Sequence, residues 1–192
     1  RKQSSLIAQS GAFSSFVNNR YEAVWQSTIS RGKGGLLDSV KNNDLSSPML
    51  NSLSKIDSCK MDYKTYGASL GEHPISILKS KIENEKFLSS QDLRLSKNGD
   101  SVEVIGLVIS RQKPKTAAGV IFLTLEDEFG FINLVIWPDL VSLFRKTILK
   151  SCILKSKGKL QIQNNVTHIV VEKLSDISHL ISDLNLNSRD FH

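Results

Sequence analysis

The sequence predicts an α+β fold, in which a small helical region precedes five strands that close into a barrel. Two observations support this class. Residues 102–174 contain five runs rich in β-branched and aromatic residues, bounded by Gly, Asn, Asp and Pro. One helix candidate, residues 139–149, lies between the third and fourth runs. The five runs are residues 102–111, 119–130, 131–137, 152–160 and 166–171.

Five strands with a helix after the third is the order of the OB-fold, a small barrel whose second and third strands form a face for oligonucleotides. Asn164 and Asn165 can supply the positive φ angles of a type I′ turn, so the last two strands are expected to form a hairpin. Gly130 can bend the chain between the second and third strands, and Gly106 indicates a bulge or sharp bend in the first. The alternative is an unrelated five-stranded sheet or sandwich.

The chain divides by composition into five segments. Residues 1–30 carry two helix candidates, and residues 31–58 form a flexible connector rich in Gly, Ser and Asn. Residues 59–96 form a helical lead-in to the barrel, which occupies residues 97–176, and residues 177–192 form a C-terminal tail. Because the barrel strands close on their own core, we expect the barrel to fold without the first two segments.

Composition limits the class of partner and compartment. The net charge of +6 and a pI near 9.3 favour an acidic partner such as nucleic acid. No apolar run of about 18 residues is present, and the N-terminus does not resemble a signal peptide. Two cysteines without metal-binding spacing indicate a reducing compartment, so we expect a cytoplasmic protein. Because no Met begins the chain, we expect it to be a piece of a longer protein.

The side chains that could carry catalysis, a histidine and an acidic cluster, are each expected to have a structural role. Pro74 fits the first position of a helix, and His73 before it is expected to cap or pack rather than act as a base. The acidic cluster at residues 126–128 is expected to be a solvated turn, because adjacent carboxylates point in different directions. No nucleophile–base pair, paired-carboxylate site or phosphate loop is recognisable. The sequence therefore predicts no catalytic residue and no metal site in this chain.

The basic residues of the barrel gather in two places. One group lies at the end of the first strand and in the loop after it, and the other alternates along the fourth strand. Period two puts the second group on one face of its strand, where it can follow a phosphate backbone or form a solvated edge. The first group is Arg111, Lys113 and Lys115, and the second is Lys155, Lys157 and Lys159.

Aromatic side chains on the outer face of the barrel can stack on bases. The candidates are Phe122, Phe131 and Trp137. Residues 121, 123 and 125 form the apolar face of the second strand, so Phe122 is expected to point outward. Trp137 is expected to be a core residue. Phe122 therefore joins the six basic residues as a predicted nucleic-acid contact.

Residues 110–130 read Ser-Arg-Gln-Lys-Pro-Lys-Thr-Ala-Ala-Gly-Val-Ile-Phe-Leu-Thr-Leu-Glu-Asp-Glu-Phe-Gly. This stretch resembles the OB-fold of bacterial C-family DNA polymerases, the DNA polymerase III alpha-subunit type. Residues 133–138 and 188–192 are most similar to the error-prone branch of that family. Residues 6–13 resemble the helix that follows the family's helix-hairpin-helix region, and residues 66–74 resemble the segment that leads into its barrel.

The resemblance implies a C-terminal fragment of an error-prone DNA polymerase that acts in damage-associated DNA synthesis. Its barrel would contact single-stranded template or primer-template DNA, and polymerase accessory proteins are further expected partners. The catalytic carboxylates and their Mg²⁺ would lie in domains that precede Arg1, so the fragment itself would hold no cofactor and would lack polymerase activity. Two alternatives remain at this point: an RNA-binding OB module of the tRNA anticodon-binding type, and a protein-interaction barrel of a replicative polymerase alpha subunit.

Overall fold

A computed structural model describes residues 2–17, 19–28, 50, 53–82, 85–163 and 166–181. The chain divides into two compact units, Arg1–Gly71 and Glu72–His192. Most of the expected connector, the expected Asn164–Asn165 turn and the expected tail beyond residue 181 lie outside the described residues. The end of the expected connector is helical, because the third helix begins at Lys55.

In its described residues, the first unit contains three helices: α1 (Lys2–Gln9), α2 (Arg20–Thr28) and α3 (Lys55–Tyr66). Helix α1 packs against α2 and touches α3. Arg20 and the buried Asp62 form an ion pair with an N–O distance of 2.5 Å, which joins α2 to α3. Two helices were predicted in residues 1–30, and both are present.

The second unit begins with two short helices, α4 (Pro74–Lys79) and α5 (Ser90–Leu93). Pro74 occupies the first turn of α4, and His73 caps it: the His73 Nδ1 accepts a hydrogen bond from the Ile75 amide at 3.2 Å. The capping role predicted for His73 is confirmed. Helix α5 starts with a capping box formed by Ser89 and Asp92.

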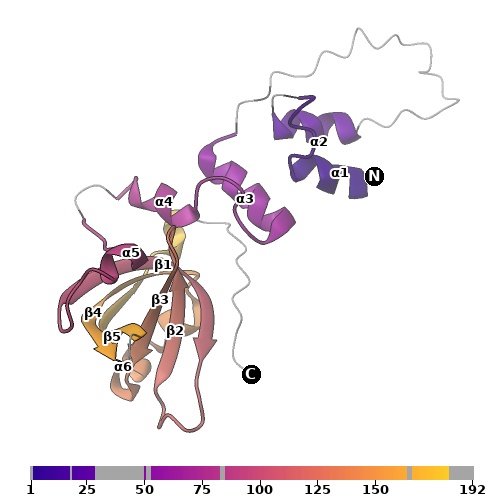
Figure 1. Ribbon diagram of the computed structural model, residues 1–192. Coiled ribbons are helices and arrows are strands. Elements are labelled where there is room, and N and C mark those ends of the chain that lie inside the picture. Colours follow the sequence, from indigo (N-terminus) through magenta and orange to yellow (C-terminus); the bar gives the residue numbers. More distant parts are fainter. Residues whose placement is uncertain are drawn as a thin grey trace, which may run out of the picture. The chain divides into compact units, whose positions relative to one another are not determined.

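Five strands follow in a closed barrel of order β1-β2-β3-β5-β4 (Figure 1). Strands β3 and β5 are parallel, and all other neighbours are antiparallel. The closed sheet confirms the predicted barrel and excludes the alternative of a sandwich. The antiparallel pairing of β4 with β5 confirms the hairpin predicted for the last two strands. The strands are β1 (Ser101–Gln112), β2 (Ile121–Glu126), β3 (Phe131–Ile136), β4 (Ile153–Gln163) and β5 (Val166–Asp176).

The helix predicted between the third and fourth strands is present as two short helices, α6 (Pro138–Leu143) and α7 (Arg145–Lys150). Phe144 separates them because its backbone, at φ −103° and ψ 20°, is not helical. Its side chain packs against the barrel core together with Leu140 and Val141. A 3₁₀ turn, η2 (Ser178–Ile181), follows the barrel.

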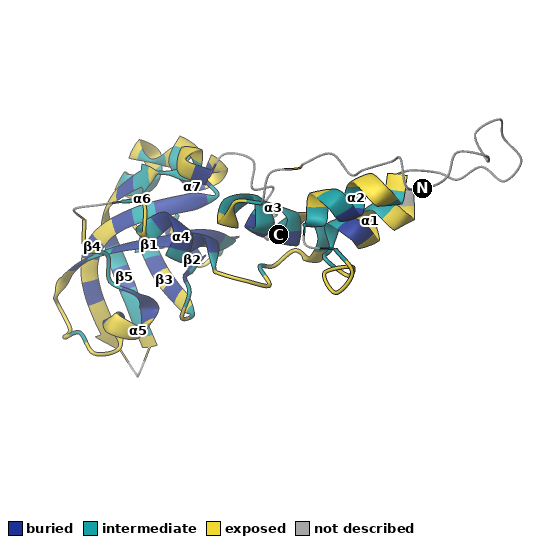
Figure 2. Cartoon of the chain, turned by 90° about the horizontal axis from the view of Figure 1, so that it is seen from above, coloured by how far each residue is buried: buried dark blue, intermediate teal, exposed yellow. Residues whose placement is uncertain are grey.

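The core consists of aliphatic residues from all five strands, together with Leu93 of α5 and Ile148 of α7. Buried residues alternate with less buried ones along β2 and β3, as expected when only one face of a strand is buried, whereas the middle of β1 is buried on both faces (Figure 2). At Gly106 an added Cβ would lie 2.7 Å from the Leu125 Cβ, so glycine permits close approach of β2 there. The bulge predicted at Gly106 lies instead between Val108 and Ser110.

Candidate nucleic-acid interface

The outer face of β2 and β3 carries two exposed aromatic rings. Phe122 is 38% exposed and pairs across the strands with Val135, while Phe131 is 63% exposed and pairs with Glu126. Residues directly opposite in an antiparallel pair share a face, so both rings lie on the face away from the core. The outward orientation predicted for Phe122 is confirmed. Burial, and then the neighbouring Asp127 charge, raise the pKa of Glu126 on this face.

The loop from β1 to β2 brings two lysines to the same region. Lys113 and Lys115 follow directly after β1 and are exposed. Ala118 at φ 45° and Gly119 at φ 89° turn the chain back, and the Val120 amide donates to the Ala117 carbonyl at 2.9 Å. The loop thus places two cations beside the strand that carries Phe122.

Arg111 does not belong to this loop, contrary to the sequence interpretation. It lies in β1, is 4% exposed, and pairs with the core residue Leu123. Its Nε donates to the Ile148 carbonyl at 2.7 Å, and its Nη2 donates to the Ser151 carbonyl at 2.5 Å. Arg111 therefore ties the end of α7 to β1 from inside the barrel, and it is not available for contact with a ligand.

The three lysines of β4 share one outward face, as predicted from their spacing. Strand β4 is not an edge, because it pairs with β1 on one side and β5 on the other. Lys155 is bonded within the protein: its Nζ pairs with the Glu85 carboxylate and with Glu103 at 3.1 Å. The hydrogen bond to Glu85 raises the pKa of Lys155. Only Lys157 and Lys159 of this group are exposed.

Trp137 was predicted to be a core residue, and that prediction is wrong. The side chain is 53% exposed at the end of β3, where Trp137 precedes α6. The core position at the end of β3 is filled by Ile136, which is fully buried. Trp137 is thus a third exposed ring near the β2–β3 face.

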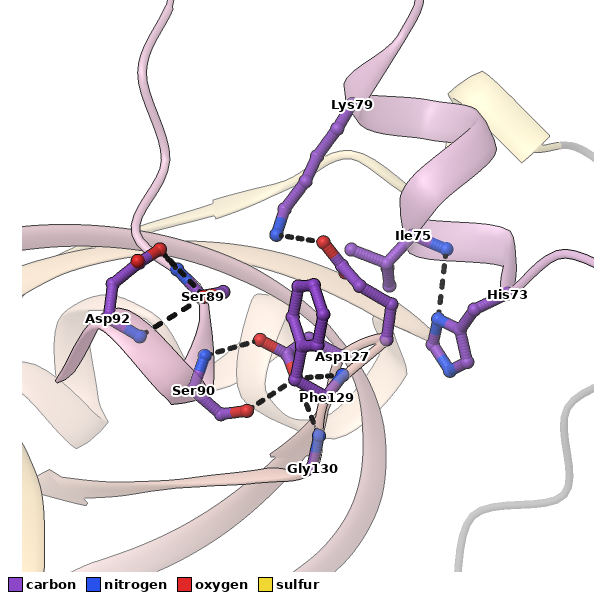
Figure 3. A network of polar contacts seen from close by, with 10 residues as sticks. His73, Ile75, Lys79, Ser89, Ser90, Asp92, Asp127, Phe129 and Gly130 are labelled. Carbon is purple, nitrogen blue, oxygen red and sulfur yellow. Dashed lines mark hydrogen bonds and ion pairs between the residues drawn. The ribbon is translucent and has the colours of Figure 1, made fainter. Parts of the chain in front are cut away.

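The acidic turn between β2 and β3 is not solvated, contrary to the sequence interpretation. Asp127 is 3% exposed and accepts four hydrogen bonds, two from Ser90 and one each from the Phe129 and Gly130 amides (Figure 3). A buried carboxylate needs such donors because burial removes its water. The Asp127 carboxylate fixes α5 to the β2–β3 turn.

Helix α4 is attached to the same turn. Lys79 Nζ lies 2.8 Å from a carboxylate oxygen of Glu128 (Figure 3). Burial lowers the pKa of His73, while the charges of Glu128 and Asp127 act in the opposite direction and that of Lys79 in the same direction. The acidic turn is therefore a structural anchor for α4 and α5.

A groove that sequence reasoning missed lies between α5 and the β3–β5 pair. Its volume is ≈ 360 Å³, and its lining includes Arg94, Phe131, Asn133, Thr167 and His168. Asn133 and His168 are register partners in the parallel pair. Polar residues at outward positions of two β-rich runs were the available signal, but only the fold shows that these runs are neighbours.

Comparison with known proteins identifies the barrel. Residues 95–177 match the tRNA_anti-codon family model, described as an OB-fold nucleic acid binding domain. The barrel is an OB-fold. Asparaginyl-tRNA synthetase from Pyrococcus horikoshii matches 48% of this chain and 23% of its own, at 20% identity and a TM-score of 0.42. The OB-fold assignment rests on the family model and the strand order.

The relatives extend the similarity beyond the OB-fold. Error-prone DNA polymerase from Pseudomonas syringae pv. tomato is 37% identical over 96% of this chain, and that from Burkholderia pseudomallei is 34% identical over all of it. The chain is homologous to a segment of error-prone DNA polymerases, which confirms the family resemblance predicted from the sequence. It spans 18% of the length of each of these relatives. None of the helices in the described part of the chain is long and apolar enough to span a membrane.

Proposed function

We propose that this chain is the C-terminal, nucleic-acid-binding part of an error-prone DNA-directed DNA polymerase acting in damage-associated DNA synthesis. Its OB-fold binds the single-stranded template. One observation carries the proposal: on the outer β2–β3 face, the exposed Phe122 lies beside a loop with two exposed lysines, and a second exposed ring, Phe131, lies at the other end of the same face. The chain spans 18% of the relatives' length, and we assign the nucleotidyl transfer itself, with its Mg²⁺, to other parts of such a polymerase.

The two residue types have different roles in binding a single strand. Lys113 and Lys115 neutralise phosphates and release counterions, so their contribution weakens with added salt. Phe122 stacks on a base, which contributes about 1–3 kcal/mol and depends little on salt. Together, these phosphate contacts and this stacking contact hold a strand without reading its sequence.

The test is a fluorescence titration of single-stranded DNA at several salt concentrations. Replacing Lys113 and Lys115 with Ala should weaken binding and flatten the slope of log affinity against log salt by up to roughly 1.4, since each phosphate contact to a single strand contributes about 0.7. Phe122→Ala should weaken binding with little change in slope.

The matched control replaces Lys157 and Lys159 with Ala. Both are exposed, but β4 pairs with neither β2 nor β3, so the slope should stay the same. If the Lys113/Lys115 variant binds like the unaltered chain at every salt concentration, the loop is not the DNA contact. The protein-interaction alternative would then gain support.

The family match favours a second candidate, a domain that binds RNA. The 2′-hydroxyl is the group by which a protein distinguishes RNA from DNA at a given site. Titration with DNA and RNA oligonucleotides of the same sequence separates the two functions. Tighter binding of RNA would replace the template proposal with the RNA-binding one.

A further inference from the structure

The groove between α5 and the β3–β5 pair has the size of a site for one small group. Small-molecule sites usually measure about 300–1,000 Å³, and this groove, at ≈ 360 Å³, lies at the lower end of that range. It exists because β3 and β5 pair only from Asn133 and His168 onward. The residues before them, Phe131–Ile132 and Val166–Thr167, line the opening between the two strands.

The floor of the groove is apolar and its rim is polar. Leu93, Ile132 and Ile169, each at most 3% exposed, belong to the lining and to the barrel core. At the rim, the Phe131 ring is 63% exposed. Such a combination, a flat ring beside an apolar floor, suits one face of a nucleobase.

Asn133 and His168 give the groove a donor and an acceptor side by side. The Thr124 hydroxyl donates to the Asn133 Oδ1 at 3.4 Å. The Asn133 amide nitrogen is therefore the atom that can donate a hydrogen bond to a ligand in the groove. The His168 Nε2 lies 3.2 Å from the Gln161 Oε1, an atom that can only accept. In the tautomer that donates from Nε2 to this oxygen, the neutral ring presents Nδ1 as the acceptor.

Arg94 supplies a positive charge at the same rim. Its Nη2 lies 4.0 Å from the position that a Cβ on Gly130 would take, directly before Phe131 in the chain. Within the described residues, no carboxylate pairs with Arg94 at ion-pair distance. A guanidinium in this position can bind the phosphate of the nucleotide whose base enters the groove.

We propose that this groove is a subsite for one base of single-stranded DNA, selective for a base with a lactam edge, that is, thymine or guanine. The inference rests on the proposed function. The base stacks on Phe131, its carbonyl oxygen accepts from the Asn133 amide, and its ring N–H donates to the His168 Nδ1. Adenine presents an amino donor and a bare ring nitrogen, so both hydrogen bonds are lost. Cytosine has a carbonyl oxygen beside its ring N3, but N3 carries no proton, so the hydrogen bond to His168 is lost.

The test compares oligo(dT) and oligo(dC) of equal length and charge, by fluorescence anisotropy with the full chain at pH 7.5. The unaltered protein should bind oligo(dT) at least about fivefold tighter, the lower end of what one bidentate base contact gives. Asn133→Ala and His168→Ala should each bring this ratio toward one by weakening oligo(dT) binding only. Phe131→Ala should weaken both by about 5- to 150-fold, and Phe129→Ala, an exposed ring outside the groove lining, should weaken neither.

Arg94→Gln should weaken both oligonucleotides equally and reduce the salt slope by about 0.7. Equal affinity of the unaltered protein for oligo(dT) and oligo(dC), or Asn133 and His168 variants that keep the ratio, would overturn the subsite while leaving single-strand binding in place. Failure of the unaltered protein to bind any single-stranded DNA would overturn the proposed function as well.

Discussion

At the scale of single residues, Arg111 shows how one extra residue changes the role of a side chain. Period-two alternation from Val104 places Arg111 outside the barrel, where it was predicted to meet DNA. The bulge between Val108 and Ser110 reverses the alternation, so Arg111 enters the core opposite Leu123. Nothing in the run of apolar residues marks the bulge, and this is why the sequence alone could not place Arg111.

Because Arg111 is structural, we predict that its loss changes stability rather than DNA binding. Arg111→Met leaves the buried carbonyls of Ile148 and Ser151 without these donors, and should lower the free energy of unfolding by about 2–4 kcal/mol. Urea denaturation measures this change. Lys113→Met, on an exposed lysine two residues away, should change stability by less than about 0.5 kcal/mol while weakening DNA binding. An Arg111 variant of unaltered stability and weakened DNA affinity would restore the original interpretation.

At the scale of elements, β4 and β5 approach each other closely at Gly158. A Cβ there would lie 2.2 Å from the Val170 carbonyl oxygen, a backbone atom that cannot move aside. We predict that Gly158→Ala lowers the free energy of unfolding by about 3 kcal/mol or more, at or beyond the upper end for overpacking. Gly71→Ala is the control, because no heavy atom lies within 4 Å of its added Cβ. Thermal or urea unfolding of both variants checks the prediction, and equal stability would contradict it.

Helix α4 gives the barrel unit a dependence on pH. Burial lowers the pKa of His73 below its ordinary value of 6.5, so the folded state resists protonation more than the unfolded state. The contribution of His73 to stability is therefore fully present above about pH 6.5 and is lost as the pH falls toward the lowered pKa. Each unit by which folding lowers the pKa corresponds to about 1.4 kcal/mol of this contribution. The raised pKa of Glu126 acts in the opposite direction.

We predict that His73→Asn loses less stability than the unaltered chain between pH 7 and pH 5. Asparagine keeps an acceptor at the N-cap of α4 but does not titrate. The contribution of Glu126 is common to both proteins and cancels in the comparison. Urea denaturation across this range gives the two curves, and parallel curves would show that His73 does not carry the effect.

The elements themselves were largely readable from the sequence. All five strands and their order with the helical insertion follow from local composition, because alternation and turn residues are local signals. Two features depend on tertiary contacts and could not be read. The anchoring of Asp127 by Ser90 joins residues far apart in sequence, and the groove depends on a parallel pairing of β3 with β5.

At the scale of the whole molecule, net charge alone does not locate the interface. The chain carries +6, but Arg20, Lys79 and Lys155 are each paired with a carboxylate. The exposed Lys113 and Lys115 beside the β2–β3 face are therefore a better guide to a phosphate backbone than the overall balance.

The division into two units leads to the last prediction. Every residue of the barrel core cluster comes from the second unit, between Leu88 and Leu174, and so do the anchors of α4 and α5. A truncated chain of residues 72–192 therefore keeps its entire core and is large enough for one stable domain. We predict that it melts in a single cooperative transition, with a midpoint within a few degrees of the barrel transition in the full chain.

The same truncated chain tests where DNA binds. Lys113, Lys115, Phe122 and the groove all lie in the second unit, so the truncated chain should bind single-stranded DNA with an unaltered salt slope. Calorimetry and salt-dependent titration provide the two measurements. A molten or insoluble product would show that residues 1–71 complete the core. A folded product with a smaller slope would show that the first unit supplies phosphate contacts of its own.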